Sequence, residues 1–166
     1  GARFISRAPY PVIGKETGFG VAPSDARALL DAGAAYVDLA GSGGTNWISV
    51  EGYRHDEEAL AAALEFADWG WRTAPLLAVS PVASGRILAS GGLRTGMDVA
   101  KSLALGAAAA GMALPLARAA SEGGARAVVA YGRRVERVLG IVMLLTGSRT
   151  VADLRRPGVL SMTGEF

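Results

Sequence analysis

Residues 87–101 carry the clearest structural signal and read Ile87-Leu88-Ala89-Ser90-Gly91-Gly92-Leu93-Arg94-Thr95-Gly96-Met97-Asp98-Val99-Ala100-Lys101. An apolar strand predicted over 86–90 runs into two glycines and then into a helix predicted over 96–105. Glycine lets an anion approach the backbone N–H groups, and a helix N-terminus favours negative charge. A second apolar strand, predicted over 108–113, meets Leu114-Pro115 in a similar turn. Two such turns in succession predict the phosphate site that (β/α)8 barrels form after their seventh and eighth strands.

The rest of the chain repeats the strand-then-helix order. Two earlier strands are predicted over 11–14 and 35–40, and a glycine-rich loop over 41–45 follows the second strand. Ser24 is expected to cap a helix over 25–30, and Thr73 to cap a helix that contains Pro75. Further helices are predicted over 56–67, 115–121 and 125–145. Four units with continuous apolar strands predict an α/β fold whose parallel sheet is buried on both faces.

Four units fit either a small open sheet or half of a (β/α)8 barrel, which has about 250 residues in all. The two glycine turns follow the third and fourth strands, where the last half of a barrel has its phosphate site. We therefore interpret residues 1–166 as the C-terminal half of a (β/α)8 (TIM) barrel, carrying its last four βα units. A bare half-barrel exposes strand edges and an apolar sheet face. We expect that the chain is part of a longer polypeptide, or that two halves associate.

Composition excludes several classes of protein. The chain has 166 residues, of which 51% are hydrophobic and 19% charged, and its net charge is +2. It contains no block of like charge and no basic stripe studded with aromatics, so we expect no nucleic-acid partner. The longest apolar stretch, near 104–116, is broken by Pro115 and too short to cross a bilayer, so we expect no membrane partner. The absence of cysteine rules out disulfides and thiolate chemistry and fits a cytoplasmic protein.

Five short motifs follow one another in a recognisable order. Together they closely resemble the C-terminal half of type 2 isopentenyl diphosphate isomerase, an FMN-dependent barrel enzyme, over nearly the whole chain up to Gly147. The motifs are Lys15-Glu16-Thr17-Gly18-Phe19-Gly20, the segment 38–47, Phe66-Ala67-Asp68-Trp69-Gly70, the segment 89–94 and Gly111-Met112-Ala113-Leu114-Pro115.

This resemblance implies a reaction and its cofactors. The family interconverts isopentenyl and dimethylallyl diphosphate by a 1,3-proton shift that uses reduced FMN and Mg²⁺, with NADPH as the usual reductant. The resemblance thus implies a prenyl diphosphate substrate and a homo-oligomeric enzyme. The family's diphosphate and Mg²⁺ ligands belong to its first half and are expected outside this chain. No catalytic residue and no metal ligand are assigned within residues 1–166.

The resemblance also assigns cofactor-binding residues. Lys15, at the end of a strand, is implied to face the flavin ring near N1 and O2, where a cation stabilises the charge of the reduced ring. Thr45 is implied to contact the flavin as well. The FMN phosphate is implied to lie in a cradle of backbone N–H groups formed by Gly91, Gly92, Leu93, Arg94, Met112 and Ala113. Many relatives have a flavin-contacting serine where this chain has Ala40, whose side chain cannot form that hydrogen bond.

Each of these residues also has an ordinary structural interpretation. Lys15 could be a solvated residue at the sheet rim, Thr45 a loop or capping threonine, and Arg94 a surface residue at a helix start. Asp38 lies within an apolar strand and must be paired if buried, so we favour a bond to the loop after its own strand over catalysis. Trp47, Trp69 and Trp71 either wall an isoprenoid pocket or contribute to packing.

Two other functions stay open. One is an FMN-dependent oxidoreductase of 2-hydroxy acids, but that chemistry needs a histidine and an arginine at strand ends. The sole histidine, His55, lies instead in a polar run before a helix. The other is a non-catalytic half-barrel that binds flavin or phosphate.

Overall fold

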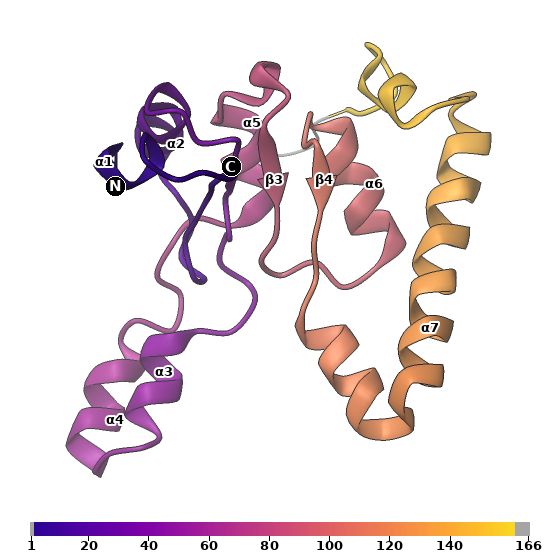
Figure 1. The fold of residues 1–166 in the computed structure, drawn as a ribbon. Coiled ribbons are helices and arrows are strands. Elements are labelled where there is room, and N and C mark those ends of the chain that lie inside the picture. The colour runs from indigo at the N-terminus through magenta and orange to yellow at the C-terminus, as the bar shows by residue number, and fades with distance from the viewer. Residues whose placement is uncertain (1, 162–166) are drawn as a thin grey trace.

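The computed structural model describes residues 2–161 (Figure 1). Strands and helices alternate along the chain from β1 onward, and an added helical pair, α3 and α4, follows β2. The elements are α1 (Ala2–Ile5), β1 (Ile13–Lys15), α2 (Pro23–Asp31), β2 (Tyr36–Asp38), α3 (Trp47–Gly52), α4 (Glu57–Leu64), α5 (Thr73–Val79), η1 (Val82–Ser84), β3 (Ile87–Ala89), α6 (Gly96–Ala104), β4 (Ala109–Ala110), α7 (Leu114–Leu145) and η2 (Val151–Arg155).

The four strands form one parallel sheet in the order β1-β2-β3-β4. Sequence order and spatial order coincide, so each helical connection moves one strand along in the same direction. A doubly wound sheet would reverse direction at a switch point. This arrangement is that of four consecutive units of a (β/α)8 barrel, as predicted. β3 and β4 point downward in Figure 1, so the loops that follow them lie together at the lower edge of the sheet.

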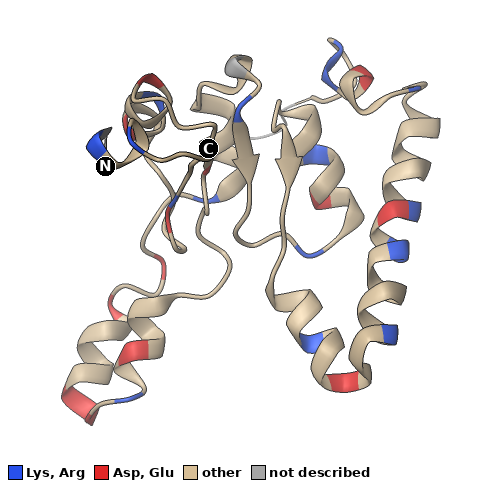
Figure 2. Cartoon of the chain, viewed as in Figure 1, with Lys and Arg blue, Asp and Glu red and all other residues tan. Residues whose placement is uncertain are grey.

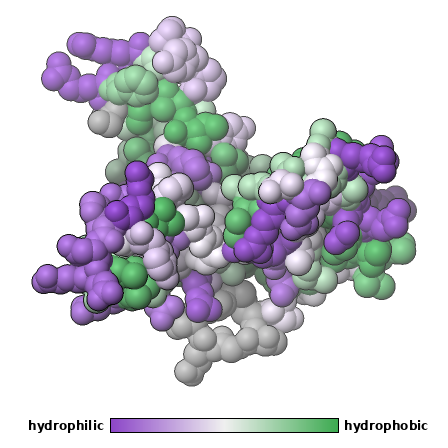
Figure 3. Space-filling model, turned by 90° about the horizontal axis from the view of Figure 1, so that it is seen from below, coloured by the Kyte–Doolittle hydropathy of each residue, from purple (hydrophilic) through white to green (hydrophobic). Residues whose placement is uncertain are grey.

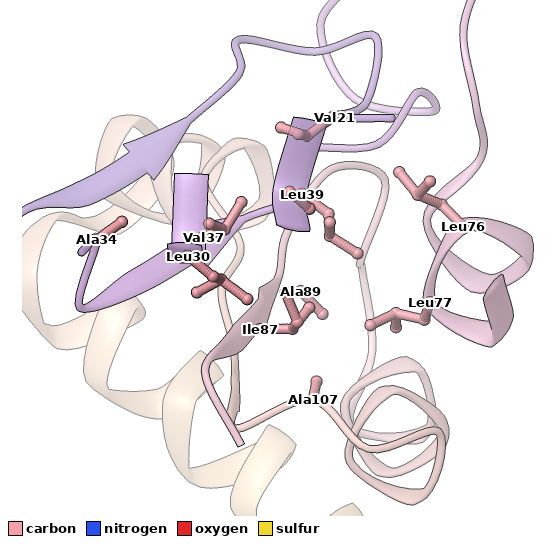
Figure 4. Packing of buried hydrophobic residues seen from close by; sticks show 11 residues of the cluster. Val21, Leu30, Ala34, Val37, Leu39, Leu76, Leu77, Ile87, Ala89 and Ala107 are labelled. Atoms are coloured by element: carbon pink, nitrogen blue, oxygen red, sulfur yellow. The ribbon is translucent and has the colours of Figure 1, made fainter. Parts of the chain in front are cut away.

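One face of the sheet holds the hydrophobic core. Val37, Leu39, Ile87 and Ala89 are fully buried and pack against residues of α2 and α5, such as Leu30, Leu76 and Leu77 (Figure 4). The parallel register places alternate residues on the opposite face.

That opposite face is open, which corrects the prediction of burial on both sides. Ile13 is 52% exposed and Tyr36 is 40% exposed. In a (β/α)8 barrel this face lines the closed interior, which needs eight strands to form. The four strands described here bury only the helix-facing side.

Two predicted helix caps are wrong, and one helix was missed. α2 begins at Pro23 after Ala22, because proline suits the first helical turn, and Ser24 therefore lies inside the helix. The N-cap of α5 is Arg72, and Thr73 uses its hydroxyl elsewhere. The sequence did not predict α3, which begins where the Asn46 side chain accepts a hydrogen bond from the Ser49 N–H at 3.0 Å.

The predicted pair of C-terminal helices is confirmed. α7 contains a break at Gly123 and Gly124, whose φ values are −153° and 60°. The break divides α7 into a short segment after β4 and a long segment that packs on α6.

Candidate functional site

One cavity of about 470 Å³ lies at the carboxyl edge of the sheet. All eight residues predicted to bind the cofactor line it, which we call the Lys15 cavity. They are Lys15, Thr45, Gly91, Gly92, Leu93, Arg94, Met112 and Ala113. Figure 3 views the molecule from this side and shows strongly hydrophilic residues on its projecting parts, with less polar residues between them. The fold therefore brings together residues that are distant in the sequence: Lys15 and Ala113, which are 98 residues apart, both line the cavity.

One wall of the Lys15 cavity is made of backbone. The loop after β2 and the turn after β3 approach so closely that no side chain fits between them. A Cβ atom at Gly91 would overlap the carbonyl oxygen of Gly41 and lie 2.7 Å from its nitrogen, and a Cβ at Gly44 would lie 3.4 Å from the nitrogen of Gly92. Gly91 also has a φ of 90°, a conformation that only glycine adopts readily. Glycine is thus required here for both space and conformation.

The cavity contains unused hydrogen-bond donors. Within residues 2–161, the N–H groups of Gly91, Gly92, Leu93, Met112 and Ala113 donate to no other protein group. Backbone N–H groups at glycine turns are suited to a phosphate because they approach it closely and carry partial positive charge. The lining therefore fits the phosphate of a cofactor.

The predicted phosphate cradle is less open at Arg94 than expected, because the backbone N–H of that residue is already bonded. The Asp98 carboxylate accepts the N–H groups of Arg94 at 2.9 Å and Thr95 at 2.8 Å, which completes a capping box with the Thr95 hydroxyl. Burial raises the pKa of Asp98, but these hydrogen bonds and the nearby Lys101 lower it below its ordinary value. Within the turn before α6, the N–H groups of Arg94 and Thr95 are therefore occupied, and those of Gly91, Gly92 and Leu93 stay available to an anion.

Lys15 is held in a fixed position by two neighbouring strands. Its ammonium group donates to Asp38 Oδ2 at 2.7 Å and to Ser90 Oγ at 3.2 Å. Ser90 donates in turn to Asp38 Oδ1 at 2.6 Å, and that oxygen also accepts the N–H of Ala40. A lysine has three N–H donors, so one remains for a ligand. Asp38 therefore bonds the start of the loop after its own strand, as predicted, and also orients Lys15.

The loop that follows Lys15 is organised by Glu16. Its Oε2 atom accepts the N–H groups of Gly18 and Phe19, both at 2.5 Å, and of Gly20 at 3.0 Å. Burial raises the pKa of Glu16, but the backbone hydrogen bonds outweigh it and lower the pKa below its ordinary value. The sequence did not identify Glu16 as a functional or structural residue. A carboxylate followed by two closely spaced glycines was the available signal, since such turns form nests that bind anions.

Arg94 and Thr45 occupy different surroundings within the cavity. Arg94 donates to the carbonyl oxygens of Gly43 at 2.9 Å and Leu93 at 3.2 Å, so it ties the loop after β2 to the turn after β3. A guanidinium has five donors, which leaves others for a ligand. Thr45 is exposed at the cavity mouth, where Trp47 also lines the wall. Ala40 also lines the cavity and has a φ of 45°, which strains a residue other than glycine.

Thr73 is a structural residue that the sequence did not identify. Its buried hydroxyl is hydrogen-bonded to the carbonyl oxygens of Ser90 at 2.9 Å and Gly91 at 2.6 Å. It therefore fixes the outer side of the turn whose inner side lines the Lys15 cavity.

Other candidate residues lie outside the Lys15 cavity. His55 is exposed between α3 and α4 and contacts Glu51 at 3.1 Å. Trp69 and Trp71 are 62% and 51% exposed and line other surface hollows. Within residues 2–161 no three acidic, histidine or cysteine residues are grouped as metal ligands. Over the same residues, none of the helices has the length and apolar character needed to cross a membrane.

Sequence comparison identifies the family. The profile of the FMN-dependent dehydrogenases matches residues 4–161. The chain belongs to this family. The resemblance to the isomerases is confirmed by two relatives named isopentenyl-diphosphate delta-isomerase. The protein of Borrelia garinii subsp. bavariensis is 44% identical over 93% of this chain, and that of Methanothrix thermoacetophila is 43% identical over 93%.

Structural comparison agrees with the family. A putative lactate oxidase of Pediococcus acidilactici matches 93% of this chain with a TM-score of 0.64 and 28% identity. The chain spans 43% of the Borrelia protein, 44% of the Methanothrix protein and 37% of the oxidase. It therefore corresponds to part of the barrel found in these proteins.

Proposed function

We propose that the protein containing this chain is an FMN-dependent isopentenyl-diphosphate delta-isomerase. It would interconvert isopentenyl and dimethylallyl diphosphate by a 1,3-proton shift, with this chain as the C-terminal half of the barrel. The observation that carries the proposal is the Lys15 cavity, in which a fixed cation and unused backbone N–H groups line one space. The names of the 44% and 43% identical relatives support the choice of isomerase within the family.

The cavity fits the two charged parts of FMN. The open N–H groups of Gly91, Gly92, Leu93, Met112 and Ala113 would bind the phosphate. The third N–H of the Lys15 ammonium would stabilise negative charge on the reduced ring, and Thr45 would bind the flavin at the mouth. Bound and reduced, FMN would supply the proton-transferring group of the reaction. Asp38 and Ser90 hold the ammonium in place beforehand, so little reorganisation is needed.

The remaining requirements of the reaction extend beyond this chain. We propose that Mg²⁺ and the substrate diphosphate bind to residues outside 1–166, and that NADPH supplies the reduction of FMN. We further propose a homo-oligomeric protein. A cytoplasmic location, which fits the cysteine-free sequence, stays a prediction.

Oxidation of a 2-hydroxy acid is the second candidate function. It is favoured by the structural similarity to the putative lactate oxidase. Against it, His55 is exposed between α3 and α4 and does not line the Lys15 cavity. Within residues 2–161 no histidine is therefore available to take a proton from such a substrate.

Activity of the full-length protein tests the proposal. The protein would be loaded with FMN and assayed with isopentenyl diphosphate, NADPH and Mg²⁺, with the product followed by NMR. We expect isomerisation in the wild type and a loss on the order of 10²-fold in Lys15→Met, comparable to the loss of one charge-stabilising donor. Lys101→Met is the matched control, because Lys101 lies on α6 outside the Lys15 cavity. Flavin bleaching by lactate or mandelate without isomerisation would favour the oxidoreductase instead.

A further inference from the structure

The outer face of the long segment of α7 carries unpaired positive charge. Residues 125–145 contain four arginines and one acidic residue, Glu136. Arg126, Arg133 and Arg137 follow a spacing of seven and four, which places them on one face of the helix. Within residues 2–161 none of them forms an ion pair. Val129 and Ala130 lie between them and share a surface groove of about 640 Å³ with these arginines. We call this groove the arginine stripe.

The helical pair α3 and α4 carries the opposite charge. Residues 47–68 contain six acidic residues and one arginine. Glu58 lies on α4, and Glu65, seven residues later, is the C-cap of that helix. Both are exposed, and neither has an ion-pair partner within residues 2–161. Ala61 and Ala62 lie between them and are exposed as well. We call this surface the acidic face.

The two surfaces match in spacing as well as in charge. Residues seven apart on a helix are separated by about 10.5 Å along its axis. Glu65 keeps helical backbone angles at the C-cap, so the separation of Glu58 and Glu65 is close to that of Arg126 and Arg133. On both helices small apolar residues lie between the charges, and small residues let two helices approach closely. Opposite charges would therefore meet at each end of an alanine-rich contact.

The matching surfaces cannot meet within one molecule. The pair α3 and α4 projects at one side of the molecule, and α7 stands at the other side (Figure 1). Figure 2 shows the acidic residues of the projecting pair and the basic residues along α7 on these separate sides. We propose that the arginine stripe binds the acidic face of a second copy of this chain. Such a contact is head-to-tail, so repeated copies close into a ring or extend as a filament.

Charge reversal in the full-length protein tests this contact. The wild type, R126E/R133E, E58R/E65R and the variant with all four substitutions would be compared by light scattering coupled to size-exclusion chromatography. We expect the wild type to be an oligomer. The molar mass of each double variant in solution should be at most half that of the wild-type oligomer. The fourfold variant should regain the wild-type mass, because both charges are exchanged and the attraction returns.

The control reverses two exposed acids elsewhere. D25R/D31R on α2 adds the same positive charge as E58R/E65R and should leave the mass unchanged. Circular dichroism checks that every variant is folded, and R126A/R133A replaces the reversed variant if it is not. A monomeric wild type, full mass in both double variants, or no recovery in the fourfold variant would overturn the proposal. The proposal would also be overturned if the arginine stripe bound anionic vesicles or RNA while the charge reversals left the mass of the oligomer unchanged. None of these results depends on the isomerase activity.

Discussion

Replacing Gly91 by alanine should destabilise the protein by disrupting the contact between the two glycine loops. The new Cβ would overlap the carbonyl oxygen of Gly41 and lie 2.7 Å from its nitrogen. Both groups belong to backbone and cannot rotate away as a flexible side chain would. The Gly41 N–H is also committed, because it donates to the Ser90 carbonyl oxygen at 2.9 Å. Relief of the overlap therefore requires the loop after β2 and the turn after β3 to separate.

The expected cost has two parts. A residue other than glycine at a φ of 90° costs about 1–3 kcal/mol in backbone strain. Forcing an extra methyl group into a packed site costs about 1–3 kcal/mol more. The sum, about 2–6 kcal/mol, is a large share of the roughly 5–15 kcal/mol by which a folded protein is stable.

Urea denaturation measures this cost against a matched control. Gly85 has a φ of 68° but no atom within 4 Å of its added Cβ, so Gly85→Ala carries the conformational part alone. Both variants remove one glycine from the unfolded chain, so that entropic effect cancels in their difference. We expect Gly91→Ala to lose about 1–3 kcal/mol more than Gly85→Ala. Equal losses would refute the close approach of the two loops.

Three further changes test other parts of the structure by urea denaturation. Glu16→Gln should lower the free energy of unfolding at neutral pH, because the folded-state pKa of Glu16 is lowered and its carboxylate stabilises the fold. The difference in unfolding free energy from the wild type should shrink as the pH falls below 4.5 and the carboxylate is protonated, and a difference independent of pH would contradict this. Thr73→Val should cost about 1–3 kcal/mol, since two backbone carbonyls lose a buried donor, whereas the exposed Thr17→Val should change stability by less than about 0.5 kcal/mol. Gly132→Ala in α7 should stabilise the protein by about 0.5–1 kcal/mol, because its added Cβ meets nothing within 4 Å, and destabilisation would show that the helix is packed there.

Local sequence signals predicted the order of strands and helices and the position of the cavity. Each strand is an apolar run that ends at glycine or at a polar residue, and parallel strands bring these ends to one edge. That geometry explains why Lys15, Gly91 and Met112 could be grouped in advance. The association of these residues with a flavin came from the resemblance to a family and not from their spacing.

The unpredicted features depend on contacts between distant segments. Thr73 resembles a helix cap in sequence, but its hydroxyl is hydrogen-bonded to a turn seventeen residues later. Ser24 resembles an N-cap, but Pro23 already begins the helix. Helix α3 is hidden by the glycines before it, and its start depends on the single side chain of Asn46. In each case the local pattern allowed two outcomes, and the three-dimensional neighbours selected one.

The backbone wall of the Lys15 cavity affects how the protein can distinguish one ligand from another. An amide N–H is the same in every amino acid, so a ligand resting on that wall detects the path of the chain and not the identity of its side chains. Discrimination between ligands that share an anionic end must then come from the side chains of the lining, where Lys15, Thr45 and Trp47 contribute chemically distinct groups. Specificity could change there by single substitutions, while anchoring at the wall stayed constant.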